Sequence, residues 1–145
     1  MRILIDADGC PVVDSTVQLA RKYHIECLIL CDTSHEIYKD GAMTFIVSKG
    51  ADSVDFALVN MVQKGDIIIT QDYGLAAMCL AKEGIALNQD GMLYTPDNID
   101  ALLTQRHFSA KTRRTGKHTK GPKKRKEEQN QSFLKTLEAL LQKEE

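Results

Sequence analysis

Carboxylates follow directly on apolar stretches of this chain. Asp6 and Asp8 come straight after the apolar run "RILI", and Asp72 closes the stretch "DIIITQD" in the same way. Asp52 and Asp55 lie at the expected start of a helix, where free backbone N–H groups and the positive end of the helix dipole favour negative charge. If these segments meet at one edge of a sheet, all five carboxylates gather there.

Such a cluster has a specific chemistry. Crowded carboxylates repel one another, so either they take up protons or a divalent cation neutralises them. Oxygen ligands favour Mg²⁺ or Mn²⁺ over zinc. A cation held in this way can activate water and stabilise the charge that builds on a phosphate under in-line attack. We therefore expect a Mg²⁺ or Mn²⁺ site formed by Asp6, Asp8, Asp52, Asp55 and Asp72.

Each of these aspartates also has a purely structural interpretation. Asp8 begins an Asp-Gly turn pair, Asp52 is a good helix N-cap with Asp55 three residues on, and Asp72 suits a turn before the next helix. Asp66 is set apart, because it begins the strand that Asp72 ends, about 20 Å away, and is expected to end the preceding turn. The joint occurrence of five acids at strand ends and helix starts favours the metal site.

Alternating strands and helices must position these carboxylates. Apolar runs indicate five strands, at 2–5, 26–32, 43–49, 66–72 and 85–89. Helical spacing and capping residues indicate five helices, at 10–24, 50–65, 73–84, 95–107 and 131–142. This alternation predicts an α/β fold, a three-layer α/β/α sandwich with a mostly parallel central sheet. Ligands bind such sheets at the carboxyl ends of the strands, where the acids fall.

Positive charge is concentrated in one stretch, which we term the basic segment (residues 106–126). Residues 1–105 carry 7 Lys and Arg against 15 Asp and Glu, the basic segment carries 10 against none, and residues 127–145 carry 2 against 5. An acidic site repels a polyanion unless cations and basic side chains offset its charge. The segment therefore predicts contacts to the phosphates of RNA or single-stranded nucleic acid. The residues expected to make them are Arg106, Lys111, Arg113, Arg114, Lys117, Lys120, Lys123, Lys124, Arg125 and Lys126.

The chain divides into three parts: an α/β domain at 1–108, a flexible basic stretch at 109–126 and an amphipathic helix at 127–145. Gly116, Gly121 and Pro122 favour a loop in the second part, which can equally be a solvated or partner-binding arm. The terminal helix can pack on its own domain or form a contact in a homo-oligomer.

Composition also bears on the compartment. Four cysteines without C-x-x-C spacing indicate free thiols in a reducing environment. No stretch is long and apolar enough to span a membrane. We expect a cytoplasmic protein without a membrane partner.

Several stretches resemble one known family across nearly the whole chain. "LIDADGCPV", "GADSVDFALV", "GDIIITQDYGLAAMCLAKEG" followed by "LNQDG", "NIDALLTQR" and the distal "GP...SFL..L" resemble the uncharacterised bacterial YaiI/YqxD family. That family is similar in turn to the PIN-like superfamily, whose members include metal-dependent ribonucleases. There the first-strand aspartate matches Asp6, the helix-start aspartate best matches Asp55, and the "T-x-D" aspartate matches Asp72.

The resemblance implies a PIN-like α/β/α sandwich and a Mg²⁺- or Mn²⁺-dependent phosphodiesterase. Asp8 and Asp52 are additional acids beyond the usual pattern. The basic residues after Phe108 are not part of a minimal PIN-like domain.

Three functions are compatible with these residues. The leading hypothesis is a metal-dependent nuclease acting on RNA or single-stranded nucleic acid, in which Asp6, Asp8, Asp55 and Asp72 are catalytic and Asp52 supports the cation. An alternative is a non-catalytic PIN-like module that binds RNA or a protein through the basic segment. A further alternative is a phosphatase for a small substrate, which would not need that segment.

Overall fold

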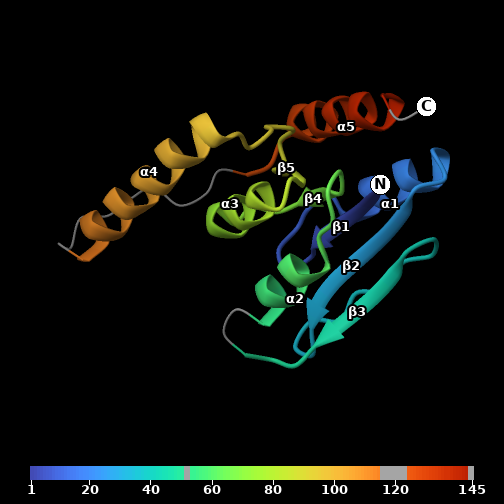
Figure 1. Ribbon diagram of the computed structural model, residues 1–145, viewed down its shortest axis with the longest axis horizontal. Coiled ribbons are helices and arrows are strands. Elements are labelled where there is room, and N and C mark those ends of the chain that lie inside the picture. The colour runs from blue at the N-terminus through green and yellow to red at the C-terminus, as the bar shows by residue number, and fades with distance from the viewer. Residues whose placement is uncertain (51–52, 115–123, 144–145) are drawn as a thin grey trace.

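Five parallel strands form the centre of the protein (Figure 1). The structure, a computed structural model, describes residues 1–50, 53–114 and 124–143, with only the backbone described over 106–114. The strands lie in the order β3-β2-β1-β4-β5, and each pairs in parallel with its neighbours. They are β1 (Arg2–Asp6), β2 (Glu26–Asp32), β3 (Met43–Val47), β4 (Ile67–Ile69) and β5 (Ile85–Leu87).

The strand order reverses between β1 and β4. From β1 the chain adds β2 and β3 on one side, then returns to place β4 on the other side of β1. Crossovers on either side of such a point diverge, which leaves a crevice at the carboxyl ends of the two strands. The residues that follow β1 and β4 therefore face the place where a parallel sheet most readily accepts a ligand.

Helices cover both faces of the sheet and confirm the expected three-layer α/β/α sandwich. Ile3 and Ile5 pack in the core cluster that includes α1 and α5, whereas Leu4 packs in the cluster that includes α2 and α3. Because both faces are covered, β1 is a continuous apolar run without polar alternation. The helices are α1 (Val13–Lys22), α2 (Ser53–Met61), α3 (Tyr73–Ala81), α4 (Pro96–Arg114) and α5 (Glu127–Gln142).

Helix α4 is longer than the sequence indicated. We expected a helix ending at 107 and a loop afterwards, but the helix continues to Arg114, so the expected boundary after Phe108 falls inside it. The reason is local: the stretch after His107 contains Ala, Lys and Arg and meets no helix breaker before Gly116. Lys117, Lys120 and Lys123 lie outside the described residues, and the flexibility of the basic segment stays a prediction.

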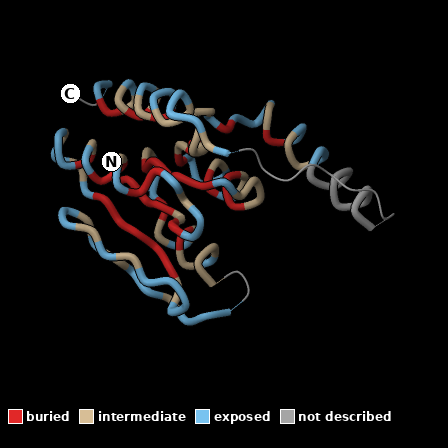
Figure 2. Tube along the Cα trace, turned by 180° about the vertical axis from the view of Figure 1, so that it is seen from behind, coloured by how far each residue is buried: buried red, intermediate tan, exposed pale blue. Residues whose placement is uncertain are grey.

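Helix α5 packs on its own chain. Phe133, Leu137 and Leu141 recur at helical spacing and are completely or almost completely buried in the same core cluster as α1, as the red inner side of this helix shows in Figure 2. Thr136 Oγ1 also donates to the carbonyl of Gly91 at 2.9 Å. Gly91 has φ +88°, and a Cβ there would lie 2.5 Å from the Ser132 carbonyl oxygen, so glycine allows this close approach.

The cysteines and the helices bear on the compartment of the protein. The cysteines Cys10, Cys27, Cys31 and Cys79 are all free thiols, as expected. Within the described ranges, no helix combines the length and the apolar character needed to cross a membrane.

Candidate functional site

The carboxyl edge of the sheet gathers four of the five predicted acids. Asp6 is the last residue of β1, and Asp72 follows β4 as the N-cap of α3, where its Oδ1 accepts a hydrogen bond from the Leu75 N–H at 3.1 Å. Asp55 lies in the first turn of α2, and Asp8 lies in the turn after β1. Because β1 and β4 are neighbours and α2 begins at the same edge, these carboxylates share one open pocket of about 250 Å³.

Asp32 belongs to the same pocket, although the sequence analysis did not include it. It ends β2 and lies beside β1 in the sheet, and its Oδ1 accepts hydrogen bonds from the N–H and hydroxyl of Ser34. These hydrogen bonds lower the pKa of the Asp32 carboxyl. The sequence does contain a sign of this position, since the apolar stretch "ECLILCD" ends in an acid just as the first strand does. We name the pocket lined by Asp6, Asp8, Asp32, Asp55 and Asp72 the acidic pocket.

Thr70 links the ends of β1 and β4. Its side-chain Oγ1 donates to Asp6 Oδ2 at 2.8 Å and accepts from the backbone N–H of Asp72 at 3.0 Å. Its carbonyl accepts from the hydroxyl of Tyr94 at 3.1 Å, and the residue is only 2% exposed. One buried hydroxyl therefore binds the carboxylate that ends β1 and the backbone of the residue that caps α3.

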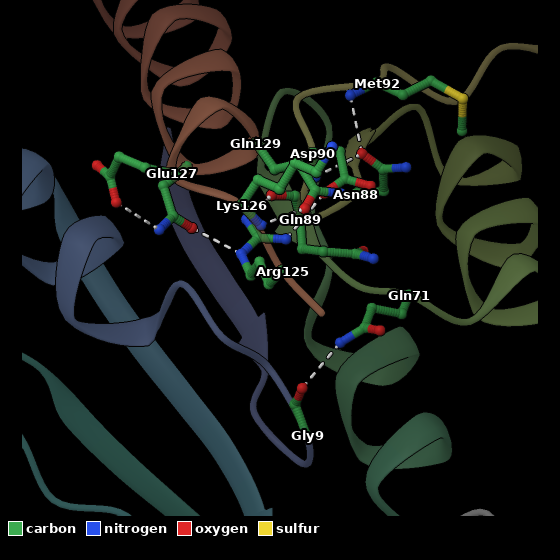
Figure 3. A network of polar contacts seen from close by, with 11 residues as sticks. Gly9, Gln71, Asn88, Gln89, Asp90, Met92, Arg125, Lys126, Glu127 and Gln129 are labelled. Carbon is green, nitrogen blue, oxygen red and sulfur yellow. Dashed lines mark hydrogen bonds and ion pairs between the residues drawn. The ribbon is translucent and has the colours of Figure 1, made fainter. Parts of the chain in front are cut away.

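The loops after β1 and β4 are joined as well. Gln71 Nε2 donates to the carbonyl of Gly9 at 2.9 Å, a contact visible in Figure 3. Gly9 has φ +68°, a backbone conformation that glycine adopts without strain. Tyr73 packs its ring edge-on against Tyr94, with ring centroids 6.1 Å apart. These contacts hold both loops in place beside the acidic pocket.

The carboxyl group of Asp6 has the most perturbed acidity in the pocket. Its pKa is raised from 3.8 to about 6, chiefly by burial and also by the charges of Asp55, Asp72 and Asp8, against the lowering effect of the Thr70 hydrogen bond. The folded protein therefore holds this proton more tightly than the unfolded chain does. Stability contributed by Asp6 is complete below about pH 4 and is lost as the pH rises to about 6.

Asp6→Asn is expected to stabilise the protein at neutral pH. Asparagine keeps the size of the side chain and an acceptor for Thr70 but cannot ionise, so it avoids the cost of a buried charge among carboxylates. We expect a gain of about 2 kcal/mol in the free energy of unfolding at pH 7.5 and almost none at pH 4. Urea denaturation in EDTA at the two pH values measures this. An equal gain at both would show that the pKa of Asp6 is not raised.

The chemistry of the donors in the pocket fits a hard divalent cation. All five side chains offer oxygen, the donor that such cations prefer, and the charges of neighbouring carboxylates contribute, after burial, to the raised pKa of Asp6. Within the residues described, however, no three acidic, histidine or cysteine side chains are close enough together to form a metal-binding group. Asp52, the fifth expected ligand, lies outside the described residues.

Asp66 lies at the opposite edge of the sheet, as expected. Its carboxylate forms an ion pair with the Arg2 guanidinium at 2.8 Å and accepts hydrogen bonds from the backbone N–H groups of Arg2 and Gln63. Its side chain is 3% exposed. These contacts tie the turn before β4 to the start of β1, so Asp66 has a structural role.

The basic residues divide into two groups. Arg106, Lys111, Arg113 and Arg114 lie on the last turns of α4, and Lys124, Arg125 and Lys126 lie directly before α5. The two groups flank the part of the basic segment that the structure does not describe.

Arg125 holds the start of α5 to the body of the protein (Figure 3). Its guanidinium donates to Asp90 Oδ1 at 2.8 Å, to the Gln89 carbonyl at 2.6 Å and to Asn130 Oδ1 at 2.6 Å. Residues 89 and 90 lie in the loop between β5 and α4. Arg125 thus brings the end of the basic segment back to the loop from which the chain enters α4.

Comparisons with known proteins show the relatives of the chain. Residues 4–143 match the family described as "Uncharacterized BCR, YaiI/YqxD family". A UPF0178 protein of Exiguobacterium sibiricum is 50% identical over 141 residues, which cover 97% of this chain and 96% of that protein. A UPF0178 protein of Ruminiclostridium cellulolyticum is 51% identical over 138 residues, covering 94% and 90%. No solved structure matches the chain significantly.

Proposed function

This chain belongs to the YaiI/YqxD family, and we propose that its acidic pocket is the centre of a divalent-metal-dependent nuclease. The substrate class is RNA or single-stranded nucleic acid, and the fold is a branch of the PIN-like superfamily. The aspartates that carry the proposal are Asp6, Asp8, Asp55 and Asp72.

One observation carries this proposal: carboxylates from separate elements line one open pocket at the point where the strand order reverses. Their mutual repulsion contributes to the raised pKa of Asp6. Aspartates that only cap helices or form turns need not lie close together. Asp66 is an example, since it pairs with Arg2 at the opposite edge of the sheet. Carboxylates that converge in one pocket repel one another, and this repulsion favours an added cation.

Each residue has a role in the proposed site. Asp6, Asp8, Asp55 and Asp72 would hold Mg²⁺ or Mn²⁺, with Asp52 as a supporting acid. The cation supplies charge neutralisation, activation of water and stabilisation of the charge that develops on the phosphate. Thr70 keeps the Asp6 carboxylate and the N-terminal end of α3 in fixed relation. The basic segment binds the phosphate backbone, and Arg125 anchors its end.

Titration of Mn²⁺ into metal-free protein tests the pocket without a substrate. We expect saturable binding to the wild type at pH 7.5 and weaker binding below pH 6, because Asp6 must lose its proton before it can bind a cation. The double variant Asp6→Asn/Asp72→Asn should lose at least about 100-fold in affinity. Isothermal titration calorimetry measures both.

Asp97→Asn is the matched control, since Asp97 is exposed on the first turn of α4 and does not line the pocket. It should bind Mn²⁺ as the wild type does. Equal binding by the double variant would place the cation elsewhere. An absence of binding by the wild type, with oligonucleotide present or absent, would favour the non-catalytic module that binds RNA or protein.

A further inference from the structure

The two outer strands of the sheet differ in how their free edges are covered. Beyond β5, Leu87 forms an antiparallel bridge with Leu93, and the Tyr94 N–H donates to the carbonyl of Ala86 at 2.9 Å. Strand β3 pairs with β2 on one side, and no described residue pairs with its other side. Figure 1 shows β3 at the margin of the sheet. Its outer backbone groups are therefore available to another strand.

Exposed apolar side chains gather at this edge. Seven large hydrophobic side chains are exposed among the described residues, and three of them, Met43, Phe45 and Ile46, belong to the five-residue strand β3. Tyr38 lies in the segment that leads to β3, and Phe56 lies on α2. Scattered single exposures are ordinary, but a concentration of this kind marks an interaction surface.

Both faces of β3 contribute to the exposed surface. Phe45 pairs in register with Leu30, which packs in the core cluster of α2, and Ile46 pairs with Cys31, which packs in the cluster of α1. Neighbouring residues in register point to the same face of a sheet. Phe45 and Ile46 therefore lie on opposite faces at the outer edge of the sheet, and both side chains are exposed.

The strand lacks the features that keep sheet edges from pairing. Monomeric proteins protect such edges with a charged residue, a proline or a bulge. The sequence of β3, "MTFIV", has no charged residue and no proline, and it pairs with β2 in unbroken register. The charges lie at its ends instead. Lys39 and Asp40 precede the strand, and Lys39 forms an ion pair with Asp14 of its own chain at 2.9 Å; Lys49 follows the strand.

We propose that β3 pairs with β3 of a second copy of this chain, antiparallel about a twofold axis at Phe45, and joins the two five-stranded sheets into one. Twofold pairing makes the surface complementary to itself. It brings Asp40 of one copy close to Lys49 of the other, twice, whereas a parallel arrangement would bring like charges together. This self-complementary pattern favours a second copy over an unrelated strand.

Phe45→Glu tests the dimer, because the twofold register sets the two new carboxylates opposite each other. We expect the dissociation constant of the dimer, measured by sedimentation equilibrium on the full chain, to rise at least about tenfold. Met78→Glu is the matched control, since Met78 is exposed to 39% on α3 and Phe45 to 37%. This control should dimerise as the wild type does, and circular dichroism checks that both variants fold.

A charge exchange tests the antiparallel register. Asp40→Lys and Lys49→Asp should each weaken the dimer, and the double variant should restore it, because the exchanged charges then meet between copies. A monomeric wild type, or a dimer that Phe45→Glu and Met78→Glu affect equally, would overturn the proposal. Failure of the double variant to restore the dimer would overturn the twofold register.

Discussion

Asp6→Asn and Asp72→Asn should each lower hydrolysis of a labelled single-stranded RNA by at least about 100-fold in Mn²⁺ or Mg²⁺. Both side chains line the acidic pocket and would bind the cation directly. Unfolding cannot account for such a loss in Asp6→Asn, which is expected to be more stable than the wild type. Asparagine is also as good an N-cap as aspartate, so α3 should keep its cap in Asp72→Asn. Initial rates from gel-resolved cleavage measure the effect.

The exposed Asp97→Asn variant serves as the control for this experiment and should keep the wild-type rate. Unchanged cleavage by Asp6→Asn and Asp72→Asn would contradict the proposed mechanism. The phosphatase alternative is tested in parallel with p-nitrophenyl phosphate. We consider two results together: p-nitrophenyl phosphate is turned over at a rate that does not change when Lys117, Lys120 and Lys123 are replaced by Gln, and the RNA is not cleaved. This combination would favour a small phosphorylated substrate.

Phe133→Ala should lower the free energy of unfolding by about 3–5 kcal/mol, the usual cost of removing a fully buried phenylalanine. Phe133 lies on α5 and is 0% exposed in the core shared with α1. The loss comes from the apolar surface returned to water and from the cavity left between the helix and the sheet. Urea denaturation with a common m-value measures it.

Phe56→Ala makes the same chemical change at a side chain that is 62% exposed. It should cost less than about 1 kcal/mol, because little buried surface is lost. Equal and small losses for both variants would mean that α5 does not belong to the core of its own chain.

The order of strands and helices along the chain was readable from the sequence. Segments such as "RILI" and "DIIITQD" are short apolar runs, and helical segments with caps separate them. Patterns of this kind depend on residues close together in the chain, so periodicity and capping preferences reveal them. The same local reading placed Asp6, Asp72 and Asp55 at strand ends and a helix start, and the structure brings these three to one edge.

Tertiary structure alone decided which of these ends are neighbours. That β1 lies between β2 and β4 depends on the crossovers, and this order puts Asp32 into the acidic pocket and Thr70 between Asp6 and Asp72. No local pattern encodes those distances. An acid at a strand end looks the same in the sequence whether its neighbour is an acid, as for Asp6, or an arginine, as for Asp66.

The C-terminal part shows the same division. The apolar spacing of "SFLKTLEALLQ" identified an amphipathic helix but not its partner, because an apolar stripe fits the core of its own chain or that of another equally well. Contacts between residues distant in sequence show that the helix packs on its own chain. Phe133 is buried in the core, Thr136 donates to the Gly91 carbonyl, and Arg125 binds Asp90. The sequence by itself therefore determined which segments form helices and strands, whereas their contacts across the fold decided which surfaces and charges meet.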